Sequence, residues 1–425
     1  MISIKKIIST TAIAVLSVSL FAQVTSDLDI APSSKTAEST QGLFDTDVDN
    51  FMSVTSWSTV KPEKFFGYFG IGNTPALDLT SYDFGFAKQF SKCYWGTYFS
   101  GNLGPVTTTK NTAAKTETTT NGSTEFVFSN LFGLGNGAGI GVDFYYADKD
   151  SKKEVIDDAK TDTDKRIWAL QLSAGLNEYT FKKFNLAPYA KVIYVMNPNG
   201  DSKVVTDTGA TTDTNDDRWW ALGLEAGADV DLSKSEAVAQ TLSLAAGFAF
   251  AKPADSEIKD TNSSALSLPV SYKVVYKATE KLGVGVLFKA DTTMSFGKSG
   301  EDVNTFGFDF VPAISTGVTF DTQKKVILNA GVGFAIPAFK YNKRTVDGDS
   351  NSTSNWNGSD ASLNFTSGFN FVPTKNISVD CSWQILNNLF GTDTTTDVTE
   401  GNYNFWNTVN NVLVHKFTFA VSVKF

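Results

Sequence analysis

The end of the chain alternates strictly between large apolar residues and polar or small ones. The segment 416–425 reads KFTFAVSVKF. Its large apolar positions are Phe417, Phe419, Val421, Val423 and Phe425. A period of two is typical of a β-strand with two different faces, and about ten residues are enough for one tilted strand to cross a bilayer core. The ending therefore predicts a membrane-crossing strand.

The same period recurs along the chain. Clear examples are the apolar sets Trp168, Leu170, Leu172, Ala174 and Leu176, and Leu242, Leu244, Ala246, Phe248 and Phe250. Short connections lie near residues 277–281, 321–325 and 373–376. Long connections run over about 105–122, 147–165, 197–217, 252–264, 291–304, 341–360 and 391–411. A soluble β-sandwich has no reason to alternate short and long connections in this way.

The terminal Phe425 and the alternation before it resemble the closing strand of bacterial outer-membrane β-barrels. These barrels have short periplasmic turns and longer extracellular loops. The expected fold is therefore all-β: a transmembrane, antiparallel, up-and-down barrel. Counting strands back from the end gives about sixteen, starting near Phe65, with fourteen to eighteen left open. The resemblance implies that Phe417, Phe419, Val421, Val423 and Phe425 are read by the barrel-assembly machinery, and that outer-membrane lipid surrounds the barrel.

Residues 1–22 have the pattern of a secretory signal peptide. Lys5 and Lys6 supply the positive start, residues 7–21 supply an apolar stretch, and Ala22 is a small residue suited to cleavage after it. We therefore expect export, with the leader removed after Ala22.

Two further regions follow the leader. Residues 23–63 are mostly polar and are expected to form a periplasmic extension or a partial plug of the barrel, which occupies residues 64–425. Asp45, Asp47 and Asp49 have the spacing of a calcium loop. The positions where that loop requires glycine and a bidentate glutamate hold other residues, so a solvated acidic turn is the better interpretation.

If the large apolar positions face lipid, the residues between them face the lumen. The predicted lumen-lining residues are Asp83, Asp143, Gln171, Lys191, Glu225, Asp229, Lys273, Lys289, Asp309, Asn329, Asn364, Asn370, Asp380, Gln384 and Lys416. Many other lumen positions are glycine, including Gly139, Gly141, Gly223, Gly227, Gly283, Gly285, Gly307, Gly331 and Gly333. These glycines either leave room for water or a plug, or relieve the curvature of a twisted wall.

Composition excludes several classes of protein. Aromatic residues make up 13% of the chain, yet mean hydropathy is only −0.12, a combination that alternating strands explain. After the leader, no apolar run approaches the roughly 20 residues that a spanning helix needs. The net charge of −9 argues against nucleic acid as a partner, because phosphate binding requires a basic face.

Candidate catalytic chemistry is sparse. The single histidine, His415, has no partner motif, and an interfacial contact with lipid headgroups explains it better than catalysis. Cys93 and Cys381 fall in strands far apart in order, so we expect no disulfide, and no zinc spacing exists. Neither a nucleophile elbow nor a phosphate loop is present. We therefore expect neither enzyme activity nor a cofactor.

A barrel of about sixteen strands leaves an aqueous channel unless something fills it. The favoured function is a porin-like channel for passive diffusion of small hydrophilic solutes, with oligomeric state open. One alternative is a gated transporter for hydrophobic solutes resembling the fatty-acid transporter family, although that family's Asn-Pro-Ala start is absent. The other is a surface-exposed structural or adhesive protein that uses threonine-rich outer loops such as 107–124.

Overall fold

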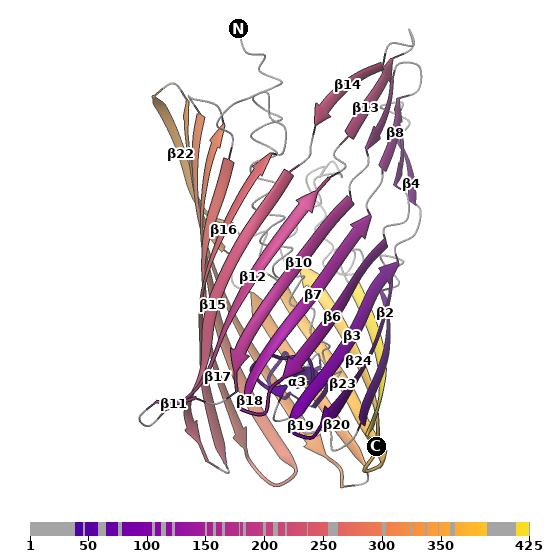
Figure 1. The fold of residues 1–425 in the computed structure, drawn as a ribbon, viewed down its shortest axis with the longest axis vertical. Coiled ribbons are helices and arrows are strands. Elements are labelled where there is room, and N and C mark those ends of the chain that lie inside the picture. Colours follow the sequence, from indigo (N-terminus) through magenta and orange to yellow (C-terminus); the bar gives the residue numbers. More distant parts are fainter. Residues whose placement is uncertain are drawn as a thin grey trace, which may run out of the picture.

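A computed structural model gives the architecture of the chain (Figure 1). The residues it describes are 39–45, 47–57, 65–74, 79–103, 107–111, 116–120, 124–148, 151–155, 159–163, 166–177, 179–181, 184–198, 201–206, 211–216, 219–235, 237–253, 262–299, 303–323, 325–335, 338–346, 348–357, 362–388 and 414–424. The predicted leader, its cleavage site at Ala22, and Phe425 lie outside these residues.

The described strands form a closed antiparallel barrel with sixteen strand positions, as the alternation predicted. Its strands are β1 (Phe65–Thr74), β2 (Leu79–Phe90), β3 (Cys93–Leu103), β6 (Thr124–Gly133), β7 (Ala138–Asp148), β10 (Arg166–Leu176), β12 (Phe184–Asn197), β15 (Trp219–Lys234), β16 (Val238–Pro253), β17 (Asn262–Lys277), β18 (Leu282–Ser299), β19 (Val303–Asp321), β20 (Val326–Ala335), β21 (Ala338–Val346), β22 (Asp349–Asn357), β23 (Ser362–Thr374), β24 (Ile377–Asn388) and β25 (Val414–Lys424). β25 pairs with both β24 and β1, which closes the barrel.

Two strand positions are each built from two segments. β19 pairs with β21 along its first half and with β20 along its second half, so β20 and β21 share one position. β22 pairs with β21 while β23 pairs with β20, so β22 and β23 share the next. The short β11 (Tyr179–Phe181) forms a small hairpin with the start of β12.

Polar hairpins replace several of the predicted long loops. Strands β18 and β19 stay paired up to Ser299 and Val303, and the hairpin of β21 and β22, over 338–357, covers most of the predicted loop 341–360. Strand pairing thus extends beyond the apolar stretch, because backbone hydrogen bonds do not require an apolar face. Residues 342–355 of the β21–β22 hairpin lack the apolar period that marks a membrane strand, and in 291–304 it is reduced to Met294 and Phe296, so sequence reasoning assigned both segments to loops.

A second, six-stranded sheet lies at the barrel end opposite the short turns (Figure 1). Its strands, in spatial order, are β14 (Thr211–Asp216), β13 (Asp201–Thr206), β9 (Ala159–Thr163), β8 (Ser151–Val155), β5 (Thr116–Thr120) and β4 (Thr107–Asn111). Three consecutive predicted loops therefore continue as paired strands. We call the opposite end of the barrel, where the short turns lie, the short-turn end.

The barrel's outer face carries large apolar side chains. Exposed examples are Phe69 at 51%, Phe84 at 50%, Leu172 at 50% and Leu224 at 51%. Leaving such side chains exposed to water would forfeit about 1.5–3 kcal/mol each relative to burial, so this face is suited to hydrocarbon.

Aromatic rings form a continuous ladder across the outer face of β2, β3, β6, β7 and β10. Ring centroids lie 6.1 Å apart for Tyr82 and Phe99, and 6.0 Å for Phe99 and Phe126. The next separations are 5.2 Å for Phe126 and Tyr146, and 4.6 Å for Tyr146 and Trp168. Such a band is typical of the membrane–water interface, where amphipathic rings gather.

The N-terminal part of the described chain includes one short helix, α3 (Asp47–Asn50). Within the described residues, no helix combines the length and the apolar character that membrane crossing requires.

Candidate functional site

Residues 39–45 and 47–57 lie inside the barrel, near the short-turn end (Figure 1, α3). We call them the lumen segment. They contact the inner faces of β2, β3, β6, β7 and β10 on one side, and of β17, β18, β19, β20 and β23 on the other. The lumen segment therefore crosses the barrel from wall to wall and narrows it at this end.

Polar contacts hold the first half of the lumen segment. The Thr366 hydroxyl donates to the Ser39 carbonyl oxygen at 2.9 Å, and the Gln41 amide donates to the Thr366 hydroxyl at 3.1 Å. On β17, in another part of the wall, the Lys273 ammonium group lies 2.9 Å from the Asp45 carboxylate. Asp45, the first residue of the predicted acidic turn, thus pairs with a residue predicted to line the lumen.

Aromatic packing holds the second half. The Phe51 ring is fully buried, with centroid distances of 5.3 Å to Phe66 and 6.1 Å to Tyr98. The Tyr94 hydroxyl donates to the Phe51 carbonyl oxygen at 2.8 Å, and the Trp57 ring stacks on Tyr94 at 5.9 Å. Several aromatic contacts from different strands therefore fix this half against the wall.

Inner-wall glycines make room for the lumen segment. A Cβ atom added at Gly133 would lie 2.4 Å from the Trp57 ring, and one at Gly139 would lie 2.5 Å from the Val54 carbonyl oxygen. Other glycines facing this segment are Gly85, Gly96, Gly141, Gly175, Gly283, Gly285, Gly317, Gly331, Gly333 and Gly368. By contrast, Gly307 faces a side chain of the wall itself. Any other residue at most of these positions would collide with the lumen segment.

Several predicted lumen-lining residues form polar pairs along the inner wall. The Tyr68 and Tyr98 hydroxyls each donate to the Asp83 carboxylate at 3.1 Å. The Gln171 amide donates to the Asp143 carboxylate at 2.8 Å. These contacts join neighbouring strands, so they also stabilise the wall.

Charged residues continue this polar lining on later strands. The ammonium group of Lys191 lies 3.5 Å from the carboxylate of Glu225. Asp229 lies opposite Ser243 in register, Lys289 opposite Ser271, and Asp309 opposite Lys340. Gln384 lies opposite Lys416, whose side chain is outside the described part of the chain, as is that of His415.

A polar group of residues lies near the short-turn end of β23 and β24. The Asn370 amide donates to the Ser378 hydroxyl at 2.8 Å and also to the Asp380 carboxylate. The Ser378 hydroxyl donates to the same carboxylate at 3.2 Å. Asp380 is only 3% exposed, so these hydrogen bonds offset the burial of its carboxylate. Asn329 and Asn364, on β20 and β23, lie on the same inner face.

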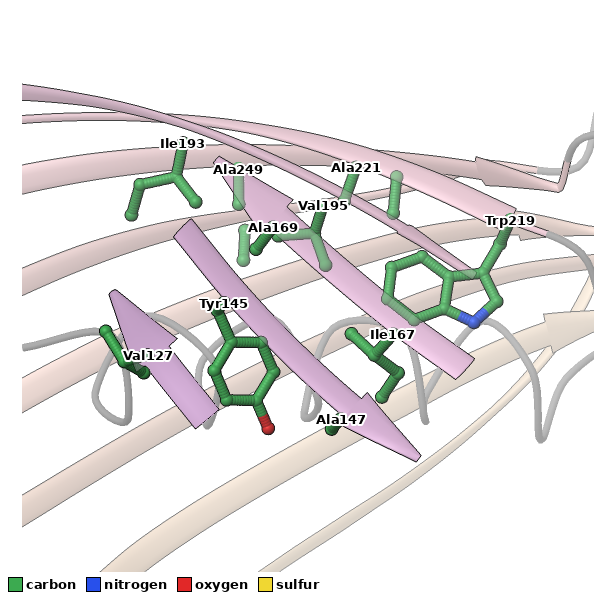
Figure 2. Close-up of a cluster of buried hydrophobic side chains, with 12 residues drawn as sticks. Val127, Tyr145, Ala147, Ile167, Ala169, Ile193, Val195, Trp219, Ala221 and Ala249 are labelled. Carbon is green, nitrogen blue, oxygen red and sulfur yellow. The ribbon is translucent and has the colours of Figure 1, made fainter. Parts of the chain in front are cut away.

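The inner wall also has an apolar part that sequence reasoning missed. Twelve buried residues make up this cluster: Val127, Tyr145, Ala147, Ile167, Ala169, Ile193, Val195, Trp219, Ala221, Ala249, Ala251 and Ala265. Figure 2 shows these side chains gathered on one side of neighbouring strands. A signal was available, because residues 192–196 read VIYVM and are apolar on both faces.

The predicted assembly residues of the last strand lie on the outer face. Phe417 is 49% exposed and Phe419 is 39% exposed, whereas Val421 and Val423 are half-buried. Cys93 and Cys381 are both free thiols. In the described part of the chain, no group of three or more His, Cys, Asp or Glu residues is arranged to hold a metal ion.

No protein-family model and no curated protein matches the chain. Among solved structures, it is similar to CdiB from Acinetobacter baumannii at 8% identity and a TM-score of 0.44, covering 84% of this chain and 59% of the length of CdiB. It is also similar to the CymD monoaromatic hydrocarbon channel at 8% identity and a TM-score of 0.40, covering 93% of this chain and 98% of CymD. Similarity to the Pseudomonas putida toluene transporter TodX is at 9% identity and a TM-score of 0.38, and it covers 92% of this chain and 98% of TodX.

Proposed function

We propose that this chain is an outer-membrane channel that admits small hydrophilic solutes by passive diffusion. The observation that carries the proposal is the contrast between the two faces of the wall. The outer face presents side chains such as Leu224 and Phe69, while the inner face presents pairs such as Lys191 with Glu225. Charged residues cost little in a hydrated interior, whereas a lysine at the lipid midplane costs about 2–4 kcal/mol.

The lumen segment sets the size of solute that we expect the channel to admit. A barrel of about sixteen strands would otherwise enclose a wide aqueous pore. Phe51 and Trp57 fill part of the short-turn end, so passage is restricted to small molecules. Opposite charges along the wall favour solutes that are neutral overall.

Uptake by liposomes tests this function directly. The refolded protein, without residues 1–22, is reconstituted into liposomes, and swelling is followed in sugars of increasing size. We expect monosaccharides to enter and long oligosaccharides to be excluded. Protein denatured before reconstitution is the control. Folded barrels that leave monosaccharides outside would contradict the proposal.

The apolar inner cluster supports a second candidate, a transporter for hydrophobic solutes. Its residues include Ile193, Val195 and Trp219, which are each no more than 7% exposed, and apolar side chains of this kind line sites for apolar ligands. Binding of an apolar fluorescent probe, compared between Ile193→Asn and the inner-wall control Ser243→Asn, separates the candidates. The second candidate requires saturable binding that only Ile193→Asn removes. Sugar uptake without such binding supports the first.

We further propose that the chain reaches the outer membrane after cleavage following Ala22, with the last strand recognised by the barrel-assembly machinery. Exposed, outward-facing Phe417 and Phe419 support this role for the last strand. Replacing both with serine is expected to lower the yield of membrane-inserted barrel in cells, while refolding in detergent is much less affected. Equal loss in both settings would indicate a purely structural role.

A further inference from the structure

One part of the boundary between the lumen segment and the wall is polar. We call it the polar seam and define it as Asn329 on β20, Asn364 and Asn370 on β23, and Ser378 and Asp380 on β24. These three strands are neighbours, since β23 pairs with both β20 and β24. The five residues therefore lie on one stretch of the inner wall that runs from Asn364 toward the short-turn end, with Thr366 and Gly368 of β23 on the same face.

Several amide atoms in the polar seam are buried without protein partners. Asn329 is 5% exposed, and neither its Nδ2 nor its Oδ1 atom has a hydrogen-bond partner. The buried Oδ1 atoms of Asn364 and Asn370 also lack partners, although the Nδ2 atom of Asn364 donates to Gln41 at 3.5 Å and that of Asn370 donates to Ser378. Buried polar groups in folded proteins are nearly always satisfied by protein or by ordered water, because desolvating them alone is costly. Three such amides on adjoining strands indicate a surface that meets water or polar solutes.

The rest of the lumen segment meets the wall differently. Its Phe51, Val54 and Trp57 pack closely on aromatic residues and on glycines such as Gly133 and Gly139. That packing leaves little room for a solute. Along the polar seam, hydrogen bonds join Ser39 and Gln41 to Thr366, which lies between Asn364 and Asn370 on β23. Passage on this side therefore requires polar contacts to be exchanged rather than apolar packing to be lost.

The polar seam ends in a cavity of about 190 Å³ at the short-turn end. Val48 of the lumen segment borders it on one side, and Asn370, Ser378, Asp380, Ser422, Lys375 and Lys424 are among the wall residues that line it. The lining combines the apolar Phe66, Val372 and Ile377 with residues that bear a carboxylate, hydroxyl groups or an ammonium group, and this combination suits a small solute that has both donors and acceptors.

We propose that the polar seam is the route past the lumen segment, and that the cavity is a binding site at its periplasmic end for small neutral or zwitterionic solutes. This inference rests on the proposed channel function and deepens it. Asp380 provides an acceptor for the solute's amine or hydroxyl donors, while Lys375 and Lys424 provide donors for its carboxylate or hydroxyl oxygens.

Thiol modification of the cavity tests the route. Ser378→Cys is made in a Cys93→Ser, Cys381→Ser background and reconstituted in planar bilayers. A small charged thiosulfonate reagent is added on the side of the short turns. We expect loss of most of the single-channel conductance. Ser367→Cys, on the outer face of β23, is the matched control and should conduct equally before and after treatment.

The outcomes separate the inference from the function on which it rests. If mass spectrometry shows that Ser378→Cys is fully modified and its conductance stays steady, the proposed route is wrong while the channel function is retained. A folded background protein that conducts nothing overturns the channel function and the route together. Should Ser378→Cys fail to fold, Ser422→Cys on β25 places a thiol in the same cavity and carries the same expectation.

Discussion

Single inner-wall glycines determine where the lumen segment can lie. At Gly139, the atom nearest to an added Cβ is the Val54 carbonyl oxygen, at 2.5 Å. A backbone atom cannot rotate away as a side chain can, so a larger residue there must displace the segment. At Gly247, the nearest atom is the Ser267 hydroxyl oxygen, which can rotate. The two sites therefore differ in what substitution does, although both lie on the inner wall.

We predict that Gly139→Val loosens the lumen segment, at a cost of about 1–3 kcal/mol for overpacking. The measurement is chymotrypsin cleavage after Phe51, which is fully buried in the intact structure. Cleavage should accelerate in Gly139→Val and stay slow in the control Gly247→Ala. Equal resistance in the two variants would contradict the close contact between Gly139 and Val54.

Phe51 should contribute far more to holding the lumen segment than its ion pair does. Phe51→Ala is expected to cost about 3–5 kcal/mol, because it removes a fully buried ring. Asp45→Asn should cost no more than about 1 kcal/mol, since the Asp45 and Lys273 side chains are 41% and 27% exposed and water screens their attraction. Urea unfolding in detergent measures both. A larger loss for Asp45→Asn would reverse this ranking.

At the scale of elements, the barrel strands could be predicted from the sequence, whereas the polar hairpins and the inner apolar cluster were missed. Membrane strands can be recognised in the sequence because lipid requires apolar residues at every second position, as at Phe417 and Phe419. The hairpin of β21 and β22 gave no such signal, because water accepts polar residues on both faces. For residues 23–63 the sequence left a periplasmic extension and a partial plug both open, since contacts such as Gln41 with Thr366 join residues 325 positions apart. The inner apolar cluster was missed because alternation was taken to imply a polar inner face throughout.

Removing the lumen segment should widen the channel. In a variant lacking residues 39–57, we expect sugars excluded by the intact protein to enter liposomes, because the short-turn end loses the Phe51 and Trp57 rings. Heat-modifiable migration on gels checks that the barrel still folds, and liposome swelling gives the size limit. An unchanged size limit in a folded variant would mean that the lumen segment does not restrict passage.

For the whole molecule, an added charge should lower stability on the outer face of the wall and change it little on the inner face. Val270 lies on the outer face near the middle of β17 and is 40% exposed, while its neighbour Ser271 lies on the inner face. Val270→Lys should lower the free energy of unfolding in lipid by about 2–4 kcal/mol, whereas Ser271→Lys should change it little. Reversible unfolding from vesicles measures both. Comparable losses at the two positions would argue against lipid on one side and water on the other.

Electrical recording from planar bilayers tests the central claim most directly, namely that an apolar outer wall encloses a hydrated, partly filled lumen. The folded protein without its leader should insert and give discrete, steady conductance steps, and the steps should be larger for the variant lacking residues 39–57. A folded, inserted barrel that passes no ions, with and without the lumen segment, would contradict the claim.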